Sequence, residues 1–497
     1  MVHLPETVVE TIINNLTTNS DRNSASLVNK TWYSVDRYSR RVVYVSNCNA
    51  ISPQRVIDRF PNLRSLTLKH KRGVLSYPPI LVPDHDPSFD PWVDVLCNNC
   101  PLLERLWLKR ARVSDQSLVM ISIRFAKFKS LRLNWCSGFS VVGLSAIASS
   151  CSILEEFEVD RCNVMDNTSR LLSSFPETLT SLKSLNISCV KGLVNPIDLE
   201  RLVARCPKLT TLLLNKTVYA NTIQRILSQY SRFVHLGVGS ANQNLEILLP
   251  YFLLSLALGK CQFIQSLSFF YLIPTKLMHA FYPICPNLVA VNLRYSAVTP
   301  NEQVKFISKC PNLRRLSVRG CIGDIGIKSV VNSCENLEEL KVYHDTEITG
   351  VSEVGLIAIS RGCQKLKSLI LFCNRMTNDA LITFAKNSPN VTCFKLIIST
   401  SKMPDHMTLQ AFDHGFRAIV QSCKNLKKLG LSGLVTNDVF LYIGMYAERL
   451  EELSVLNGDE SDAGLHYVFN GCKSLRKAEI RHYPYADDAS LAAFYGY

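Results

Sequence analysis

The sequence lacks long apolar runs, a signal-peptide pattern and the usual share of charged residues. Its longest nearly apolar run, Leu248–Leu258, has 11 residues, whereas a membrane span needs about 20. Residues 1–20 lack the basic-then-apolar order of a secretory signal peptide. Charged residues make up 19% of the 497, below the ~25% usual in soluble proteins. We therefore expect neither a membrane protein nor a secreted one.

Motifs that carry catalysis or bind metals are also missing. The chain has only 10 histidines, and it contains no GxSxG, P-loop, HExxH or GxGxxG motif in a context that supports catalysis. Cys97 and Cys100 form one C-x-x-C pair with no second pair, so the spacing does not predict a zinc site. The sequence favours a binding protein over an enzyme.

Cysteine, in contrast, is abundant, and its positions follow a recurring phrase, C-P-x-L-x-x-L-x-L. Ten of the 18 cysteines open the phrase: Cys100, Cys151, Cys206, Cys261, Cys285, Cys310, Cys334, Cys363, Cys423 and Cys472. Five more close it: Cys136, Cys162, Cys189, Cys321 and Cys373. Cysteine in such a repeat behaves as a small buried hydrophobic residue. We expect free thiols and a reducing compartment, the cytosol or the nucleus.

The phrase occurs 16 times and predicts an α/β leucine-rich-repeat solenoid, curved like a horseshoe. Its first Leu-type position falls at residues 63, 103, 128, 154, 182, 209, 233, 264, 288, 313, 337, 366, 391, 426, 450 and 475. Most intervals are 24 to 31 residues, which is the leucine-rich-repeat period. Each unit supplies a short parallel strand and a helix, and neighbouring units stack to bury their apolar faces. Two long intervals predict loops over about 71–97 and 399–422.

The first sixty residues do not repeat, and they predict two helices. Leu4-Pro5-Glu6 opens the first, and an apolar stripe follows on Val8, Val9, Ile12, Ile13 and Leu16. Asp21 is expected to cap a second helix carrying Leu27, Val28 and Trp32. This unit is either a cap for the solenoid or a docking module for a partner; its periodicity alone does not separate the two.

Charge on the expected concave face points to an anionic ligand. The net charge is +14, and three positions per strand should face the concave side. Basic residues occupy 12 of these 48 positions: Lys69, Arg105, Lys109, Arg132, Arg294, Arg315, Arg319, Lys341, Lys395, Lys428, Lys477 and Arg481. Acidic residues occupy six, three of them together as Glu156, Glu158 and Asp160. The favoured hypothesis is a polyanion pocket formed as curvature brings the two basic ends together. A solvated basic face and nucleic-acid binding are the alternatives; the stacking aromatic residues that nucleic acid favours are sparse here.

Several segments resemble a known family. The order Leu4-Pro5-Glu6, Val9, Ile13, Leu16 and Ser26–Trp32 resembles the F-box. Further matching stretches are Asp21–Ser24, Val45–Pro53, Ser184–Cys189, Phe372–Asn378 and Leu431–Leu434. Together they resemble the plant auxin receptors, the transport-inhibitor-response and auxin-signalling F-box family; the jasmonate receptor is a poorer match. The resemblance implies an F-box over 1–45 and a repeat solenoid over 46–497.

This resemblance implies a non-catalytic substrate receptor of an SCF ubiquitin ligase in the nucleus. Its F-box would bind the SCF adaptor, and through it the cullin complex, by Leu4, Pro5, Val9, Ile13, Leu27, Val28 and Trp32. Its repeats would hold inositol hexakisphosphate, auxin and the degron of a transcriptional repressor, with no metal, nucleic acid or membrane partner. The inositol-phosphate contacts carry over to Lys69, Lys109, Arg110, Lys341, Lys428 and Arg476. Lys341 and Lys428 replace family arginines, and Cys393 replaces a third.

The hormone-binding positions of the family map onto Tyr77, Phe372, Lys395, Leu396, Leu431, Ser432, Ser454 and Glu479. Lys395 replaces the arginine that grips the auxin carboxylate, and a lysine lacks the planar bidentate fork. Gly430 replaces a neighbouring serine, while Val74 and Tyr77 replace two phenylalanines. Relative to the family, the last repeats and cap are expected to be missing. Two alternatives stay open: an F-box receptor with altered or no hormone binding, and a leucine-rich-repeat scaffold outside any ligase.

Overall fold

A computed structural model describes residues 4–70, 87–165, 170–240, 251–271, 273, 275–296, 298–343, 350–398, 403–456 and 462–481. These residues form two compact units. The first unit comprises Met1–Ile226 and His235–Gly239, and the second comprises Leu227–Val234 and Ser240–Tyr497. Each unit is described by itself below.

Within the described residues, seventeen strands form the strand layers of the two units, and their pairings are parallel. The first unit contains β1(Val42–Val45), β2(Ser65–Lys69), β3(Arg105–Lys109), β4(Ser130–Asn134), β5(Glu156–Asp160), β6(Ser184–Asn186), β7(Thr211–Leu213) and β8(His235–Ser240). The second contains β9(Ser266–Tyr271), β10(Ala290–Asn292), β11(Arg315–Arg319), β12(Glu339–Tyr343), β13(Ser368–Cys373), β14(Cys393–Ile398), β15(Lys428–Leu431), β16(Glu452–Leu456) and β17(Lys477–Arg481). All sixteen predicted strands are present, each beginning two residues after its first Leu-type position. The sequence pattern missed β1.

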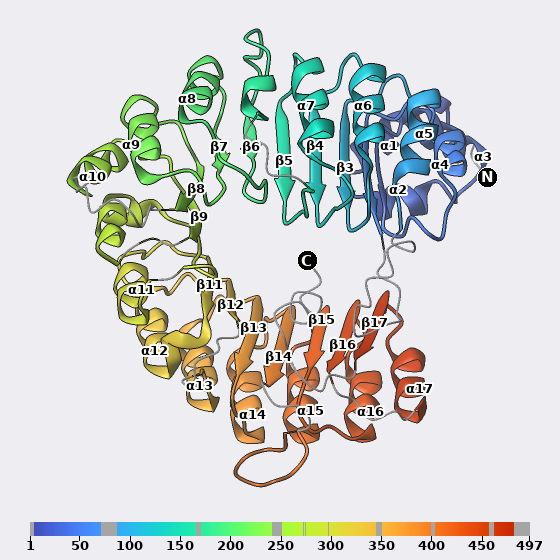
Figure 1. Ribbon diagram of the computed structural model, residues 1–497. Coiled ribbons are helices and arrows are strands. Elements are labelled where there is room, and N and C mark those ends of the chain that lie inside the picture. The colour runs from blue at the N-terminus through green and yellow to red at the C-terminus, as the bar shows by residue number, and fades with distance from the viewer. Residues whose placement is uncertain are drawn as a thin grey trace. The chain divides into compact units, whose positions relative to one another are not determined.

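Helices lie on the outer side of each strand layer (Figure 1). The first unit contains α1(Glu6–Asn15), α2(Asn19–Ala25), α3(Lys30–Ser39), α4(Pro53–Arg59), α5(Asp90–Asn99), α6(Asp115–Arg124), α7(Val141–Ser150), η1(Leu172–Ser174), α8(Pro196–Arg205) and α9(Ala220–Gln229). The second contains α10(Tyr251–Gly259), η2(Thr275–Asn287), α11(Pro300–Ile307), η3(Gly320–Ile322), α12(Gly323–Ser333), α13(Glu353–Gly362), α14(Asn378–Asn387), α15(Asp413–Ser422), α16(Asn437–Tyr446) and α17(Asp462–Gly471). Within the described residues, each helix is too short or too polar to cross a membrane.

The alternation of the phrase explains the layering. In β2, Leu66 and Leu68 are buried against the helices, whereas Ser65, Thr67 and Lys69 are half-buried on the opposite face. Side chains of a strand point alternately to its two faces, so positions 1, 3 and 5 of each strand face away from the helices. The leucine-rich-repeat prediction is confirmed.

The phrase-opening cysteines end the helices. Cys100, Cys151, Cys206, Cys334 and Cys363 are each the C-cap residue of the helix that precedes a strand. All 18 cysteines are free thiols, and 14 are buried. Several reach a neighbouring repeat: the Cys206 thiol donates to the Leu179 carbonyl at 3.4 Å, for example. Small buried hydrophobic side chains with a weak donor suit this position.

A second link between repeats lies at the helix N-termini. The Asp115 carboxylate accepts hydrogen bonds from the backbone N–H of Ser140 (2.8 Å), from its hydroxyl (2.7 Å) and from the Gly143 N–H (2.9 Å). A Cβ atom at Gly143 would overlap the Asp115 carboxylate, so glycine makes room for this contact. The pairs Asp324–Ser352 and Asp413–Thr436 repeat the arrangement in the second unit.

Replacing Asp115 with alanine should lower the free energy of unfolding by about 2 kcal/mol, because three hydrogen bonds to a charged acceptor disappear. A urea titration followed by circular dichroism measures the change. Asp94→Ala is the matched control, since Asp94 is exposed on the neighbouring helix α5 and surface changes are usually within about 0.5 kcal/mol. Equal midpoints for the two variants would contradict the proposed link.

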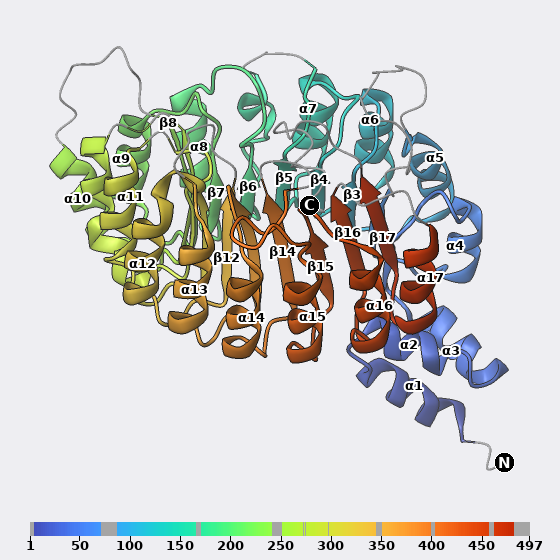
Figure 2. The same cartoon turned by 90° about the horizontal axis from the view of Figure 1, so that it is seen from below.

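The N-terminal helices correct one prediction. The second helix is capped by Thr18, whose hydroxyl accepts from the Asp21 N–H at 3.0 Å, so Asp21 lies in the first turn and is not the cap. This helix ends at Ala25, and a turn carrying Leu27 and Val28 leads into α3, which holds Trp32. Figure 2 shows α1, α2 and α3 projecting from the end of the first unit, next to α4.

The two predicted loops are shorter than expected. Helix α5 begins at Asp90 and helix α15 begins at Asp413, inside the ranges 71–97 and 399–422. Each repeat needs a helix to cover its strand, so the residues just before Cys100 and Cys423 fold as in the other repeats. Residues 71–86 and 399–402, like the predicted hormone contact Tyr77 and its neighbour Val74, lie outside the described residues.

Candidate functional site: an exposed apolar surface and two charged strand faces

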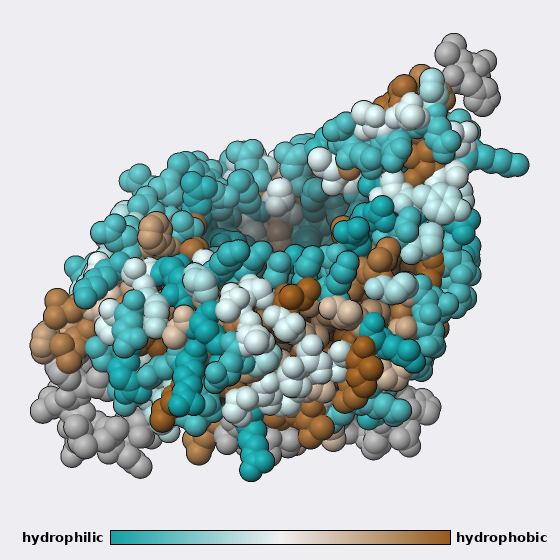
Figure 3. All heavy atoms as spheres, turned by 90° about the horizontal axis from the view of Figure 1, so that it is seen from above, coloured by the Kyte–Doolittle hydropathy of each residue, from teal (hydrophilic) through white to brown (hydrophobic). Residues whose placement is uncertain are grey.

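The three N-terminal helices divide their apolar residues between a small core and the surface. Val9, Ile13 and Val35 are buried together, and Trp32 packs against them. Leu4, Leu27 and Val28 are exposed by 43%, 84% and 61%. Exposed apolar residues gathered on a small domain mark an interaction surface. Figure 3 shows apolar surface on this helical projection at the upper right. Of the predicted adaptor-binding residues, Val9 and Ile13 are therefore core residues, whereas Leu4, Leu27 and Val28 face solvent.

A buried carboxylate fixes these helices to the first repeat. Asp36 is fully buried, and its two oxygens contact Arg22 at 3.2 Å, Arg40 at 3.0 Å and Arg59 at 3.1 Å. Arg22 lies on α2 and Arg59 on α4, so one aspartate joins the projecting helices to the solenoid. Such a network fixes the orientation of the helices relative to the first repeat, because moving the helices away would leave buried charges without their partners.

In the first unit, basic residues gather on strands β2, β3 and β4. Lys69 and Lys109 are adjacent in register, and Arg110 follows directly, with a left-handed backbone φ of 65°. The Lys109 ammonium lies 3.4 Å from the centre of the Trp107 ring. Burial, together with the nearby charges of Lys69, Arg110 and Arg132, lowers the pKa of Lys109 to about 8. Cations that repel each other this strongly are stabilised by a bound anion.

Strand β5 limits this basic area on one side. Arg132 contacts Glu156 at 3.1 Å and Glu158 at 3.5 Å, which offsets its charge. Asp160 accepts a hydrogen bond from Asn134 at 2.7 Å, and burial raises its pKa. Lys109 nevertheless lies within the positive field of Lys69, Arg110 and Arg132.

In the second unit, charged residues of both signs share the strand face. Register aligns Cys393, Lys428, Glu452 and Lys477 in one row across β14 to β17. The Lys428 ammonium lies 3.3 Å from Glu452. Burial raises the pKa of Glu452, but Lys428, Lys395 and Lys477 outweigh it and lower that pKa overall.

The next row of the same strands contains the predicted carboxylate-binding lysine. Lys395, Gly430, Ser454 and Glu479 are aligned across β14 to β17. Lys395 is only 3% exposed, and burial lowers its pKa. The Glu479 carboxylate contacts Lys477 at 2.8 Å. This row therefore sets a positively charged lysine beside a glycine and a serine hydroxyl, and both the ammonium and the hydroxyl can donate hydrogen bonds to a carboxylate.

The other predicted hormone-binding residues divide by strand face. Phe372 and Ser432 follow the outward-facing alternation, and both are buried, with 3% and 1% exposed. Leu396 and Leu431 occupy the third Leu-type position of their repeats and are fully buried toward the helices. Only their backbone is placed to meet a ligand on the open strand face. Of the predicted phosphate contacts here, Lys341 pairs with Glu339, and Arg476 is exposed just before β17.

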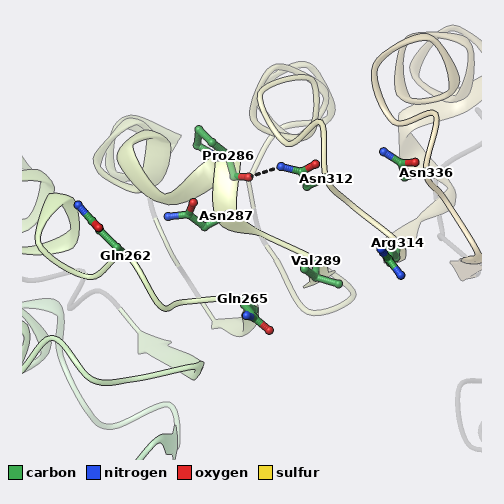
Figure 4. Close-up of a pocket in the computed structure, with 8 residues that line it drawn as sticks. All are labelled: Gln262, Gln265, Pro286, Asn287, Val289, Asn312, Arg314 and Asn336. Carbon is green, nitrogen blue, oxygen red and sulfur yellow. Dashed lines mark hydrogen bonds between the residues drawn. The ribbon is translucent and has the colours of Figure 1, made fainter.

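A separate polar groove of about 370 Å³ lies at the turns before β9 to β12. It is lined by Gln262, Gln265, Pro286, Asn287, Val289, Asn312, Arg314 and Asn336. Asn312 donates to the Pro286 carbonyl at 2.8 Å, which joins successive turns (Figure 4). None of the predicted site residues lines this groove.

Comparison with known proteins agrees with this division into helical projection and repeats. Residues 1–42 match the F-box family, and residues 362–385 match the leucine-rich-repeat family. A Transport inhibitor response 1-like protein of Oryza sativa subsp. japonica is 44% identical over 502 residues, covering 100% of this chain and 87% of that protein. The chain belongs to the family of F-box leucine-rich-repeat proteins similar to transport inhibitor response 1. GRR1-like protein 1 of Arabidopsis thaliana is 39% identical over 498 residues, covering 99% and 84%.

Among solved structures, the TLR13–ssRNA13 complex matches with a TM-score of 0.40 and 13% identity, covering 89% of this chain and 62% of that chain. This likeness is too distant to bear on function. F-box proteins of this type partner with the SCF adaptor and cullin, and they are generally non-catalytic substrate receptors. Within the described ranges, no three His, Cys, Asp or Glu side chains are grouped to hold a metal ion.

Sequence reasoning missed two residues of these surfaces. Asp36 carried no motif, although a lone acid within a basic helix is a usable signal of an internal ion pair. Trp107 was not singled out among the strand positions that face away from the helices. Its position between Arg105 and Lys109 on one strand face was the signal for a cation–aromatic contact.

Proposed function

We propose that this protein is the substrate-recognition subunit of an SCF ubiquitin ligase that acts in auxin signalling and recruits transcriptional repressors for degradation. The supporting observation is the exposed apolar set Leu4, Leu27 and Val28 on a helical unit that matches the F-box. An apolar surface of this kind is suited to the SCF adaptor, while the repeats carry the ligand-binding faces. Residues 1–45 would form the F-box and 46–497 the receptor, in the nucleus.

Inositol hexakisphosphate is the proposed cofactor, and the residues present fit it. In the first unit, Lys69, Lys109 and Arg110 form a cluster whose mutual repulsion an anion would relieve. In the second unit, Lys341, Lys428 and Arg476 are the corresponding candidates. Lys341 and Lys428 contact glutamates, so they offer less excess charge than the first cluster. The cofactor would supply a fixed negative surface on the strand face.

Auxin is the proposed small ligand, with its carboxylate on Lys395. The buried ammonium, Gly430 and Ser454 lie side by side across three strands. Phe372 and Ser432, on the next outward row, would contact the rest of the ligand. A carboxylate would offset the burial that lowers the pKa of Lys395. The bound acid would then complete a surface for the repressor degron.

Auxin-dependent capture of a repressor degron by the purified full chain with its adaptor tests this function. Lys395→Arg should increase auxin-dependent capture by about three- to tenfold, since arginine binds a carboxylate in bidentate fashion. Lys367→Arg is the control, because Lys367 pairs with Glu338 at the exposed strand edge, and it should leave capture unchanged.

Two results would favour the alternatives. If both the unmodified protein and Lys395→Arg bind the adaptor but neither captures the degron in an auxin-dependent way, an F-box receptor with another ligand is favoured. The presence of Lys395 and Gly430, in place of the arginine and serine of the family, supports that alternative. Failure to bind the adaptor favours a leucine-rich-repeat scaffold outside the ligase.

A further inference from the structure

We propose that anion binding on strands β2–β4 takes up a proton at Lys109, and that Trp107 is the positioning residue that makes this lysine titrate. The inference rests on the proposed function, because the anion is the inositol polyphosphate of that proposal. It concerns the first unit alone. It adds a regulatory property, pH-dependent cofactor affinity, and a residue that the resemblance does not include.

The surroundings of Lys109 are unusually unfavourable for a free ammonium ion. From β2, its register partner Lys69 faces it, and from its own turn Arg110 does so. From β4, it meets Asn134 and Arg132. His70, which follows β2, is only 4% exposed and packs against Phe89. Like charges nearby and lost hydration both favour the neutral amine.

Among the described residues, the carboxylates of β5 contact side chains other than Lys109. Glu156 and Glu158 contact Arg132, and Asp160 accepts from Asn134. Glu156 also contacts Arg105 of β3 at 3.5 Å, so these carboxylates pair with residues of β3 and β4 other than Lys109.

Trp107 keeps Lys109 in this position. The ammonium lies 3.4 Å from the ring centre on the adjacent outward-facing position of the same strand. The ring attracts the cation but also replaces water on one side of it. The amine is consequently held near its partners instead of extending into solvent.

These contacts agree with a lysine pKa of about 8 in the unliganded protein. A polyanion placed against Lys69, Lys109 and Arg110 favours the ammonium form and raises this pKa. Because the anion binds the protonated form better, affinity must fall as pH rises through about 8. Between pH 7 and pH 9 the protonated fraction of the free lysine falls from about 0.9 to about 0.1, so we expect roughly tenfold weaker binding.

Isothermal titration calorimetry in buffers of different ionisation enthalpy measures the proton uptake. The probe is myo-inositol hexakissulfate, because its sulfate groups stay ionised at every pH used and contribute no protons. At pH 8.5, the full chain with its adaptor should take up about 0.7 proton per bound ligand. Lys109→Arg should still bind but take up almost none, and its affinity should no longer change between pH 7 and pH 9.

Three further variants separate coupling from general charge loss. Trp107→Ala should bind at pH 7 within a few-fold of the unmodified protein, yet take up less proton at pH 8.5, and Trp107→Phe should restore part of the uptake. Lys129→Arg, at a lysine paired with Glu104 on the strand edge, should leave uptake unchanged. If the unmodified protein bound the probe without taking up a proton, or if Lys109→Arg took up as much proton as the unmodified protein, the coupling would be overturned but the proposed cofactor would stand. No binding at any pH would overturn the proposed cofactor as well.

Discussion

Asp36→Ala should lower the free energy of unfolding of the N-terminal helices by about 3–5 kcal/mol, the largest stability effect expected in this protein. The substitution leaves Arg22, Arg40 and Arg59 near one another without their shared counterion. Their side chains are only 14%, 7% and 16% exposed, so water cannot replace the carboxylate. Hydrogen exchange of the full chain should show lost protection in α1–α3, with the repeats of the second unit unchanged.

Asp58→Ala provides the matched control for this effect. Asp58 is an exposed aspartate on α4, close in sequence to Arg59, and accepts one hydrogen bond from Gln54. Its removal should alter protection by less than about 0.5 kcal/mol. If Asp36→Ala were as mild as this control, the network would not be what joins the helices to the first repeat.

Leu27→Asp should weaken binding of the SCF adaptor by about 100-fold or more without changing the fold. Leu27 is 84% exposed in the turn between α2 and α3, so the free protein loses little by the change. In the complex, the new carboxylate would be buried against an apolar partner, which costs several kcal/mol. Surface plasmon resonance with immobilised adaptor measures the loss.

Leu193→Asp is the corresponding control, because Leu193 is also an exposed leucine of the first unit, at 65%, between β6 and α8. It should bind the adaptor as the unmodified protein does. Wild-type affinity in Leu27→Asp would remove the adaptor-facing role from this turn and with it the main support for the ligase assignment.

The repeat architecture was predictable from sequence because the same pattern of apolar positions recurs sixteen times. Each first Leu-type position and its cysteine fix where a strand begins and where the preceding helix ends. Strand β1 was not predicted, because neither the cysteine nor the first leucine of the phrase precedes Val42–Val45. The helices α5 and α15 were assigned to loops because a long interval between strands does not say where within it the extra residues lie.

The candidate sites were predictable only as positions along strands. Alternation placed Lys69, Lys109 and Lys395 on the open strand face from the sequence alone. It did not show that Lys395 is buried, because that burial depends on side chains supplied by adjacent repeats. The cap of α2 was misassigned because Thr18 and Asp21 are both residue types that cap helices well. In the structure the helix begins three residues earlier than predicted, so Thr18 is the cap and Asp21 lies in the first turn.

The phrase-opening cysteines give ten of the sixteen repeats an indicator of local opening. Burial raises the pKa of Cys151, Cys334, Cys363 and Cys423 to about 12, so these thiols stay protonated and unreactive while their repeats are packed. Such a thiol becomes available to an alkylating reagent only when its own helix separates from its neighbour. The rate at which each of these cysteines is alkylated would therefore report the order in which the repeats that carry them open.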